Sequence, residues 1–495
     1  MEDWPAMSSV PSPLRGRPTS SAQLNPPWLP PTWALAAALV AAAANLRLAL
    51  AGFPPLAEQI VADLHLSNAQ AGALTTLPVL CMGLFAPAAH WLGTRYGAAP
   101  AVLAALACLT LGSALRLAGA HLVPLFAGTL LAGVGIAVAG TLLPRLVKAL
   151  FPPERVGAVT GIYMVSMMAG AAGSSAAAVP LAQWLGSWEA SLASWALVGL
   201  VGLLAWAPLA RRVWVNRAEV AGAAASGLPW RSATAWLVAG YLVTQSWAFY
   251  SCLAWIAPSY VHLGWDSADA GYLLAVFSAT QIVSGLLAPV LTDRVHDLRG
   301  PLLAAAGFAL LGLLGLLVAP AAAPWVWVSL IGIGQGAAFA LALVLLVRYA
   351  ATPADSGRLS AMGFLVGYSI ASFGPFTMGA VRDATHGFHV VWLVLVLLMA
   401  LQVAFVLLLR PSRPRVTGDW PLSPLRHVTE ASHRGSSLSA GEAVRRSSSR
   451  PSSPPETGRR AEPNLCRATH RGPGPGQPGA RPRRRRPRHR PAGWP

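Results

Sequence analysis

The sequence has little charge and few cysteines. Charged residues make up 11% of its 495 positions and hydrophobic residues 55%, with a mean hydropathy of +0.53, whereas a soluble globular chain carries about a quarter charged residues. The four cysteines, Cys81, Cys108, Cys252 and Cys466, show no paired spacing, which argues against a disulfide framework or a cysteine metal site. Water is therefore not the solvent of most of the chain. We expect a membrane protein with no metal and no cofactor.

Lysine is almost absent, and the basic side chains are unevenly placed. Lys148 is the only lysine, and residues 411–495 hold 18 of the 36 basic residues but 5 of the 18 acidic ones. This segment mixes Pro, Ser, Gly and Arg and cannot bury enough apolar surface to fold alone. We expect residues 411–495 to form a disordered basic cytoplasmic tail that contacts anionic lipids rather than nucleic acid. Residues 1–32 are predicted to be a disordered cytoplasmic N-terminus.

Long apolar stretches are what the sequence has in abundance. A spanning helix needs about 20 mostly apolar residues, and six such stretches lie on either side of a polar break. They are residues 33–57, 69–92, 99–119, 122–146, 156–180, 191–210, 233–258, 269–291, 301–320, 324–347, 359–380 and 389–409. The sequence therefore predicts an all-α membrane protein with twelve transmembrane helices in two six-helix bundles. The bundles are residues 33–210 and 233–410, and residues 211–232 form a cytoplasmic linker.

Basic residues also distinguish the two sets of loops between these stretches. The loops after stretches 2, 4, 6, 8 and 10 carry 12 Lys and Arg residues, and the other set carries only Arg116 and Arg382. Loops rich in Lys and Arg remain in the cytoplasm. We therefore predict a multi-pass protein of the cytoplasmic (inner) membrane, with both termini in the cytoplasm.

The two halves of the sequence echo one another. Residues 92–96 after the second stretch parallel residues 291–295 after the eighth, and Gly133 and Gly135 parallel Gly332 and Gly334. Internal repeats of this kind are typical of transporter folds.

Several short motifs support a more specific interpretation. They are Asn45-Leu46-Arg47 with Pro54-Pro55-Leu56 after it, Leu74-Thr75-Thr76-Leu77-Pro78-Val79, Ala254-Trp255, and Gly374-Pro375. Together they resemble the cyanate permease and nitroimidazole transporter family of the major facilitator superfamily, over about residues 33–410.

The resemblance implies the major facilitator fold and alternating access between two bundles. It also implies a conformational latch in the loops after stretches 2 and 8, formed by Arg95, Asp293 and Arg294. Thr94 stands where the superfamily usually has an aspartate, and this puts the first half of the latch in doubt.

Arg47 is the strongest candidate for a solute-binding residue. It lies near the middle of stretch 33–57, where an ionisable side chain costs several kcal/mol and marks a functional site by default. Every acidic residue of residues 33–410 falls in a predicted loop or at the end of a stretch. An anionic solute would therefore supply the missing countercharge. A structural arginine, bound to helix C-terminal carbonyls or to a neighbouring polar side chain, remains the alternative.

Other polar side chains within the stretches are further candidates because each can donate a hydrogen bond to a solute. They are Asn45, Tyr163, Gln245, Trp255, Gln281, Gln335 and Tyr368. Gln281 and Gln335 are preferred because an unpaired amide in hydrocarbon must face protein or water. Packing between helices is the alternative for each of them, and for Asn45 it is favoured, since Asn45 is offset by roughly 200° from Arg47 on a helix.

Acidic and histidine side chains gather just after the first stretch. Glu58, Asp63 and His65 form either a titratable cluster that couples protons to transport or, as the sequence favours, a solvated loop.

These observations favour a monomeric secondary active transporter for a small polar, anionic solute, cyanate-like or nitroimidazole-like in scale; coupling to protons stays open. Two alternatives remain, a proton-coupled multidrug exporter of the same fold and a transport-dead membrane receptor. An enzyme is not expected, because no nucleophile, metal cluster or carboxylate pair lies at a plausible depth.

Overall fold

The computed structural model describes residues 32–212, 227–292, 295 and 297–417. In its N-terminal half the helices are α1 (Thr32–Ala51), η2 (Pro54–Leu56), α2 (Ala57–Leu64), α3 (Asn68–Leu84), α4 (Ala86–Tyr96), α5 (Ala98–Leu115), η3 (Arg116–Ala118), α6 (Leu122–Leu150), α7 (Pro153–Leu185) and α8 (Trp188–Arg212). In its C-terminal half they are α10 (Ala233–His262), α11 (Ser267–Thr292), α12 (Arg299–Val318), α13 (Pro324–Arg348), α14 (Pro353–Ala371), α15 (Phe373–Thr385) and α16 (His389–Leu408).

Each of the twelve predicted stretches is helical, and the all-helical membrane fold is confirmed. Among the described residues, ten helices are long and apolar enough to cross a membrane, and the bent pair α3 and α4 gives an eleventh. The remaining stretch is α10, which has 30 residues, most of them buried. Its Trp, Tyr, Ser, Thr and Gln side chains lower its hydropathy, and most of them, Trp236 being an exception, are buried against other helices.

Three of the predicted stretches are interrupted, each beside a proline. The first continues after α1 through η2, which begins with Pro54 and Pro55, into α2. The second bends by 53° between α3 and α4, next to Pro87 in the first turn of α4. The eleventh breaks at Ser372, three residues before Pro375. Proline lacks the backbone donor that a continuous helix needs, which explains breaks at these places.

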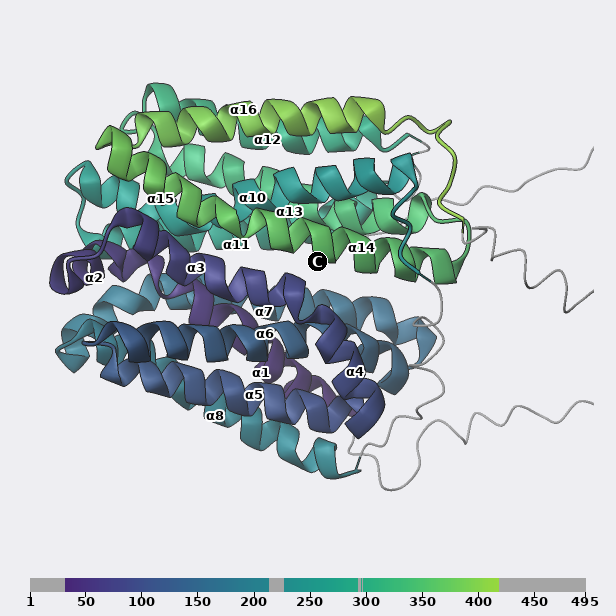
Figure 1. Ribbon diagram of the computed structural model, residues 1–495, viewed down its shortest axis with the longest axis horizontal. Coiled ribbons are helices and arrows are strands. Elements are labelled where there is room, and N and C mark those ends of the chain that lie inside the picture. Colours follow the sequence, from purple (N-terminus) through teal and green to yellow (C-terminus); the bar gives the residue numbers. More distant parts are fainter. Residues whose placement is uncertain (1–31, 213–226, 293–294, 296, 418–495) are drawn as a thin grey trace, which may run out of the picture. The chain divides into compact units, whose positions relative to one another are not determined.

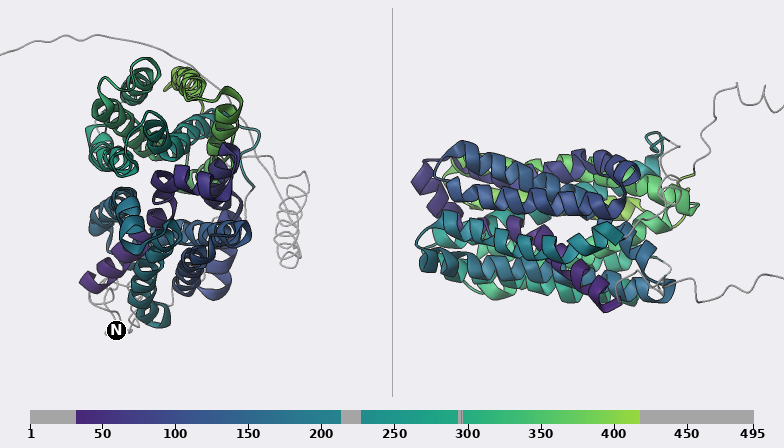
Figure 2. Two further views of the ribbon diagram at one scale, coloured as in Figure 1. Left: turned by 90° about the vertical axis from the view of Figure 1, so that its left-hand side faces the viewer. Right: turned by 90° about the horizontal axis from the view of Figure 1, so that it is seen from below.

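The N-terminal and C-terminal helices form separate groups, purple to blue and teal to green, when the structure is seen end-on (Figure 2). The most extensive contacts between the groups are those of α3 with α14 and α15, and of α7 with α11 (Figure 1), and η2 also contacts α10 and α11. At the first contact the backbones touch: a Cβ atom on Gly72 would come within 2.3 Å of the Pro375 carbonyl oxygen, and one on Gly379 within 2.3 Å of the Asn68 carbonyl oxygen. Only glycine permits this approach.

Some predictions fall on residues outside the described ranges. These are most of the N-terminal segment 1–32, the linker between residues 213 and 226, the tail beyond residue 417, and Asp293 and Arg294 of the predicted latch. The bundle boundaries 33–210 and 233–410, the monomeric state and the lipid contact of the tail stay predictions.

Candidate functional site

Arg47 lies in the C-terminal part of α1 and reaches the opposite half of the molecule. Its side chain is buried, with 7% of its surface exposed. The guanidinium carbon lies 5.1 Å from the centre of the Phe249 ring and 5.6 Å from that of Tyr250, both on α10. The Nη1 atom is buried and has no hydrogen-bond partner among the described residues. Aromatic faces stabilise this cation, but no described carboxylate forms an ion pair with it.

Two further candidates, Tyr163 on α7 and Tyr368 on α14, lie near Arg47. Each hydroxyl is close enough for the charge of Arg47 to act on it. The Tyr368 ring lies 6.2 Å from the Tyr250 ring in an edge-on arrangement and stacks on Phe364 at 5.5 Å. The structure thus brings Arg47 and Tyr368 together around an aromatic wall from α10, and Tyr163 packs within the N-terminal half, within range of the Arg47 charge.

Phe249 and Tyr250 were missed by the sequence analysis. An aromatic residue in an apolar span usually packs in the core, so composition gives no sign that these rings face a buried charge. The adjacent pair on the most polar of the spans is the only hint that the sequence offers.

Asn45 lies apart from this cluster, between α1 and α8. Its Nδ2 atom donates to the carbonyl oxygens of Ala41, at 2.7 Å, and Val198, at 3.2 Å. These contacts tie two helices of the N-terminal half together, which is the packing alternative weighed for this residue.

The three glutamines lie inside the C-terminal half. Gln245 Nε2 donates to Gln335 Oε1 at 3.2 Å, and Gln335 Nε2 contacts Met399 Sδ at 3.8 Å. Gln281 Nε2 donates to the Phe277 carbonyl oxygen at 3.0 Å. The preferred pair, Gln281 and Gln335, is not joined by a hydrogen bond, and neither residue contacts Arg47 through one. A solute contact for them stays a prediction.

Trp255 belongs to a different cluster, together with Arg382 and Phe388. Its Nε1 atom donates to the Pro375 carbonyl oxygen at 3.0 Å, and its ring lies 5.8 Å from the guanidinium carbon of Arg382. Arg382 donates to Glu58 through Nη1, at 2.5 Å, and Nη2, at 3.2 Å. The centre of the Phe388 ring also lies 4.5 Å from the guanidinium carbon of Arg382.

The expectations for Glu58 and Arg382 as loop residues were wrong. Arg382 lies in the last turn of α15 and is only 9% exposed, and Glu58 lies in the first turn of α2. Asp63 is also not a free loop side chain, because it accepts a hydrogen bond from Trp188 Nε1 at 2.9 Å. Each of the two charges, on Glu58 and Arg382, compensates the other, so both can be buried more than either would be alone.

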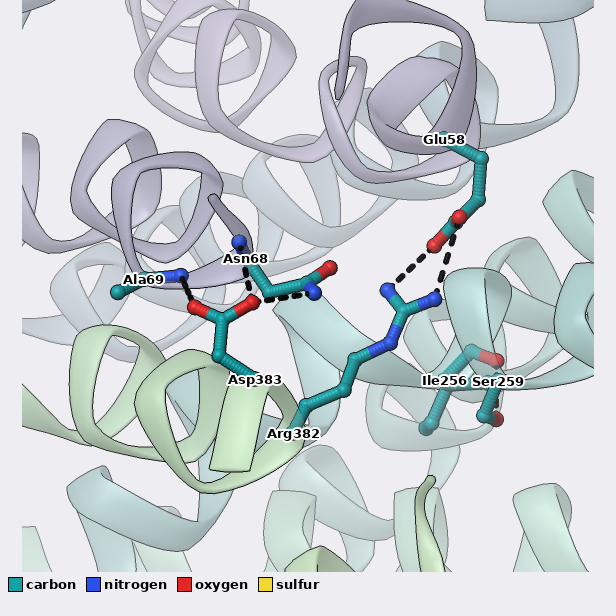
Figure 3. A network of polar contacts seen from close by, with 7 residues as sticks. All are labelled: Glu58, Asn68, Ala69, Ile256, Ser259, Arg382 and Asp383. Carbon is teal, nitrogen blue, oxygen red and sulfur yellow. Dashed lines mark hydrogen bonds and ion pairs between the residues drawn. The ribbon is translucent and has the colours of Figure 1, made fainter. Parts of the chain in front are cut away.

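Asp383 makes a second contact between the halves, at the same end of the helices as Arg382. Its Oδ1 atom accepts from the backbone nitrogen of Asn68 at 3.0 Å and from Asn68 Nδ2 at 2.6 Å, and its Oδ2 atom accepts from the backbone nitrogen of Ala69 at 2.9 Å (Figure 3). A carboxylate from α15 therefore covers the N-terminus of α3, where free N–H groups and the helix dipole favour negative charge. We call Glu58, Asn68, Ala69, Arg382 and Asp383 the end cluster.

The latch is predicted at the end of the helices opposite to the end cluster. Arg95 lies in the last turn of α4 and is exposed, whereas the end cluster includes the start of α3, the first helix of the same span. Asp293 and Arg294 lie outside the described residues, so the latch stays a prediction.

Comparison with known proteins identifies the family. Residues 33–375 match the family model described as Major Facilitator Superfamily. The chain belongs to the major facilitator superfamily. Within it, the chain is 34% identical to a 2-nitroimidazole transporter of Escherichia coli (strain K12) over 372 residues, 75% of this chain and 94% of the relative. It is 30% identical to a cyanate transport protein of the same strain over 359 residues, 72% of this chain and 91% of the relative.

These relatives confirm the resemblance that the sequence motifs carry. The fold of this superfamily member is also similar to that of a D-xylose-proton symporter, with a TM-score of 0.60 and 16% identity over 78% of this chain and 99% of that one. The protein is a multi-pass membrane transporter of the major facilitator superfamily.

Proposed function

We propose that this transporter moves a small anionic solute and that Arg47 binds it. The observation that carries the proposal is the buried guanidinium of Arg47, whose Nη1 atom has no hydrogen-bond partner among the described residues. A buried charge left without a partner costs several kcal/mol. A bound anion would supply the missing partner and two charge-assisted hydrogen bonds.

The position of Arg47 fits a solute that both halves contact. Arg47 belongs to α1 and the rings beside it belong to α10, so an anion at Nη1 would lie between the N-terminal and C-terminal helices. This is the place where transporters built from two related halves bind their substrates. The relatives transport 2-nitroimidazole and cyanate by name, and both compounds are small; cyanate is an anion.

Alternating access requires each end of the molecule to open in turn. The end cluster holds one end closed in this structure through Glu58, Arg382 and Asp383. Opening that end would break these contacts. By the distribution of arginine in the loops, this end faces away from the cytoplasm, both termini are cytoplasmic, and the protein lies in the inner membrane.

Purified full-length protein tests the proposal through binding measured by titration calorimetry. The probes are cyanate, nitrite and 2-nitroimidazole, with the cation ethidium as the counter-probe for a drug exporter. We expect at least one of the two anions to bind and ethidium not to bind, since a like charge beside Arg47 repels it. Binding of ethidium without either anion would contradict the proposal.

A further inference from the structure

Two tyrosine hydroxyls near Arg47 have no hydrogen-bond partner among the described residues, and a third has only a weak one. Tyr163 and Tyr368 make no hydrogen bond within the described residues, and the Tyr250 hydroxyl has only the Met82 sulfur, at 3.7 Å. A thioether is a weak acceptor. Two other buried tyrosines behave differently: the hydroxyl of Tyr241 donates to the Ala338 carbonyl oxygen at 3.0 Å, and that of Tyr260 to the Pro320 carbonyl oxygen at 3.0 Å.

This difference matters because a tyrosine hydroxyl that the protein leaves without a partner, and that is not sealed off among the buried unpartnered atoms, can donate to water or to a solute. Tyr163 is 5% exposed, and Tyr368 is half-buried. Their free hydroxyls lie in the one neighbourhood that also contains the unpaired Nη1 atom of Arg47. A guanidinium N–H group and phenolic O–H groups, all without a protein acceptor among the described residues, therefore occur near one another.

The free donors come from both halves of the molecule. Arg47 lies on α1 and Tyr163 on α7, whereas Tyr250 lies on α10 and Tyr368 on α14. The ring centroids of Tyr250 and Tyr368 are 6.2 Å apart in an edge-on arrangement, and the Tyr250 ring centre lies 5.6 Å from the guanidinium carbon of Arg47. A small solute in this place would meet a donor from each of four helices.

We propose that Tyr163, Tyr250 and Tyr368 donate hydrogen bonds to the anion held by Arg47, so that the site selects small deprotonated anions that only accept hydrogen bonds. A guanidinium has donors and no acceptor, and a neutral phenol offers its O–H. The site thus favours carboxylates, nitrite and cyanate over the corresponding amides, whose N–H groups would face donors. This inference rests on the proposed function, because it needs an anion at Arg47.

Replacing each tyrosine with phenylalanine removes the donor and keeps the ring. Titration calorimetry on the full-length protein measures the dissociation constant for cyanate and nitrite in Tyr163→Phe, Tyr250→Phe and Tyr368→Phe. We expect each change to raise it about tenfold or more, as for a lost hydrogen bond to a charged group. Thermal unfolding of each variant should stay near that of the parent, because no protein hydrogen bond is lost at Tyr163 or Tyr368.

Tyr241→Phe is the matched control. Its hydroxyl bonds to a carbonyl inside the C-terminal half, so its loss should lower the unfolding temperature and change the dissociation constant less than about twofold. A second comparison uses acetate and acetamide, which have nearly the same shape. Acetate should compete with the bound anion and acetamide should not.

The outcomes separate this inference from the proposed function. Unchanged dissociation constants in Tyr163→Phe and Tyr368→Phe, together with lost binding in Arg47→Ala, would overturn the tyrosine assignment and leave the Arg47 site standing. An equal rise in the Tyr241→Phe control would show a general structural effect and also overturn it. If Arg47→Ala binds anions as well as the parent does, or if the parent binds neither cyanate nor nitrite, the proposed function itself fails.

Discussion

Arg47 and Arg382 are both buried between the halves of this transporter, and they differ in their countercharge. Arg382 is flanked by the rings of Trp255 and Phe388 and forms an ion pair with Glu58. Arg47 is flanked by the rings of Phe249 and Tyr250, and among the described residues it has no ion-pair partner. The aromatic surroundings are alike, so the carboxylate is the difference. At the end cluster the protein neutralises its own cation, whereas at Arg47 we propose that an anionic solute does so.

The two sites also differ in what joins the halves. The end cluster adds the three hydrogen bonds of Asp383 to the N-terminus of α3, and the backbones touch beside it at Gly379. Around Arg47 the contact across the halves is between a cation and aromatic faces, which is weaker and less directional than an ion pair. A structure joined tightly at one end and loosely at its centre can close around a solute.

A carboxylate placed beside Arg47 should make this site resemble that of Arg382. Of the changes considered, we expect this one to have the largest effect on anion affinity. In Phe249→Glu, a carboxylate on α10 can pair with the guanidinium and occupy the anion site. We expect the dissociation constant for cyanate or nitrite to rise by about a hundredfold or more, since a fixed buried charge competes with the ligand. Phe249→Gln has the same shape without the charge and is the control. Equal losses in the two variants would show that the ring, rather than the countercharge, decides binding.

Removing the carboxylate from Arg382 should have a smaller, structural effect. Glu58→Gln leaves the buried guanidinium with a neutral partner, and because the Glu58 side chain is 26% exposed we expect a loss of about 1–3 kcal/mol in stability. The end cluster should also open more often.

Spin labels at His65→Cys and Thr385→Cys, in a protein without its native cysteines, measure that opening. Both positions are exposed and lie at the same end, in the N-terminal and C-terminal halves respectively. The distance distribution should shift towards longer values in Glu58→Gln, while the dissociation constant of the anion changes far less than in Phe249→Glu. An unchanged distribution would mean that the ion pair does not hold this end closed.

The extent to which the sequence predicts this structure follows from the range of the interactions involved. Hydropathy depends on neighbouring residues, so each spanning stretch could be located from the sequence. A charged residue in the middle of an apolar stretch is also visible in the sequence, so Arg47 could be selected. The ion pair of Glu58 and Arg382 joins residues 324 positions apart, and no local pattern encodes it. Gln245 and Gln335 could be recognised as buried amides, but only the structure shows that they bind each other.

Asn45 gives the smallest expected effect and separates packing from binding next to the site. Asn45→Ala removes the hydrogen bonds to the carbonyl oxygens of Ala41 and Val198. We expect stability to fall by about 0.6–2 kcal/mol and the dissociation constant of the anion to stay within about twofold of the parent. Thermal unfolding and calorimetry on the same preparation check both values. A large rise in the dissociation constant with unchanged stability would place Asn45 in the binding site after all.

The most direct test of the central claim is the affinity of the folded Arg47→Ala protein for anions. Titration calorimetry with cyanate and nitrite should show binding in the parent, none in Arg47→Ala, and partial recovery in Arg47→Lys, because lysine keeps the charge and loses the paired donors. Thermal unfolding shows whether each variant is folded. Arg47→Ala protein that is well folded and binds either anion with the affinity of the parent would contradict the account.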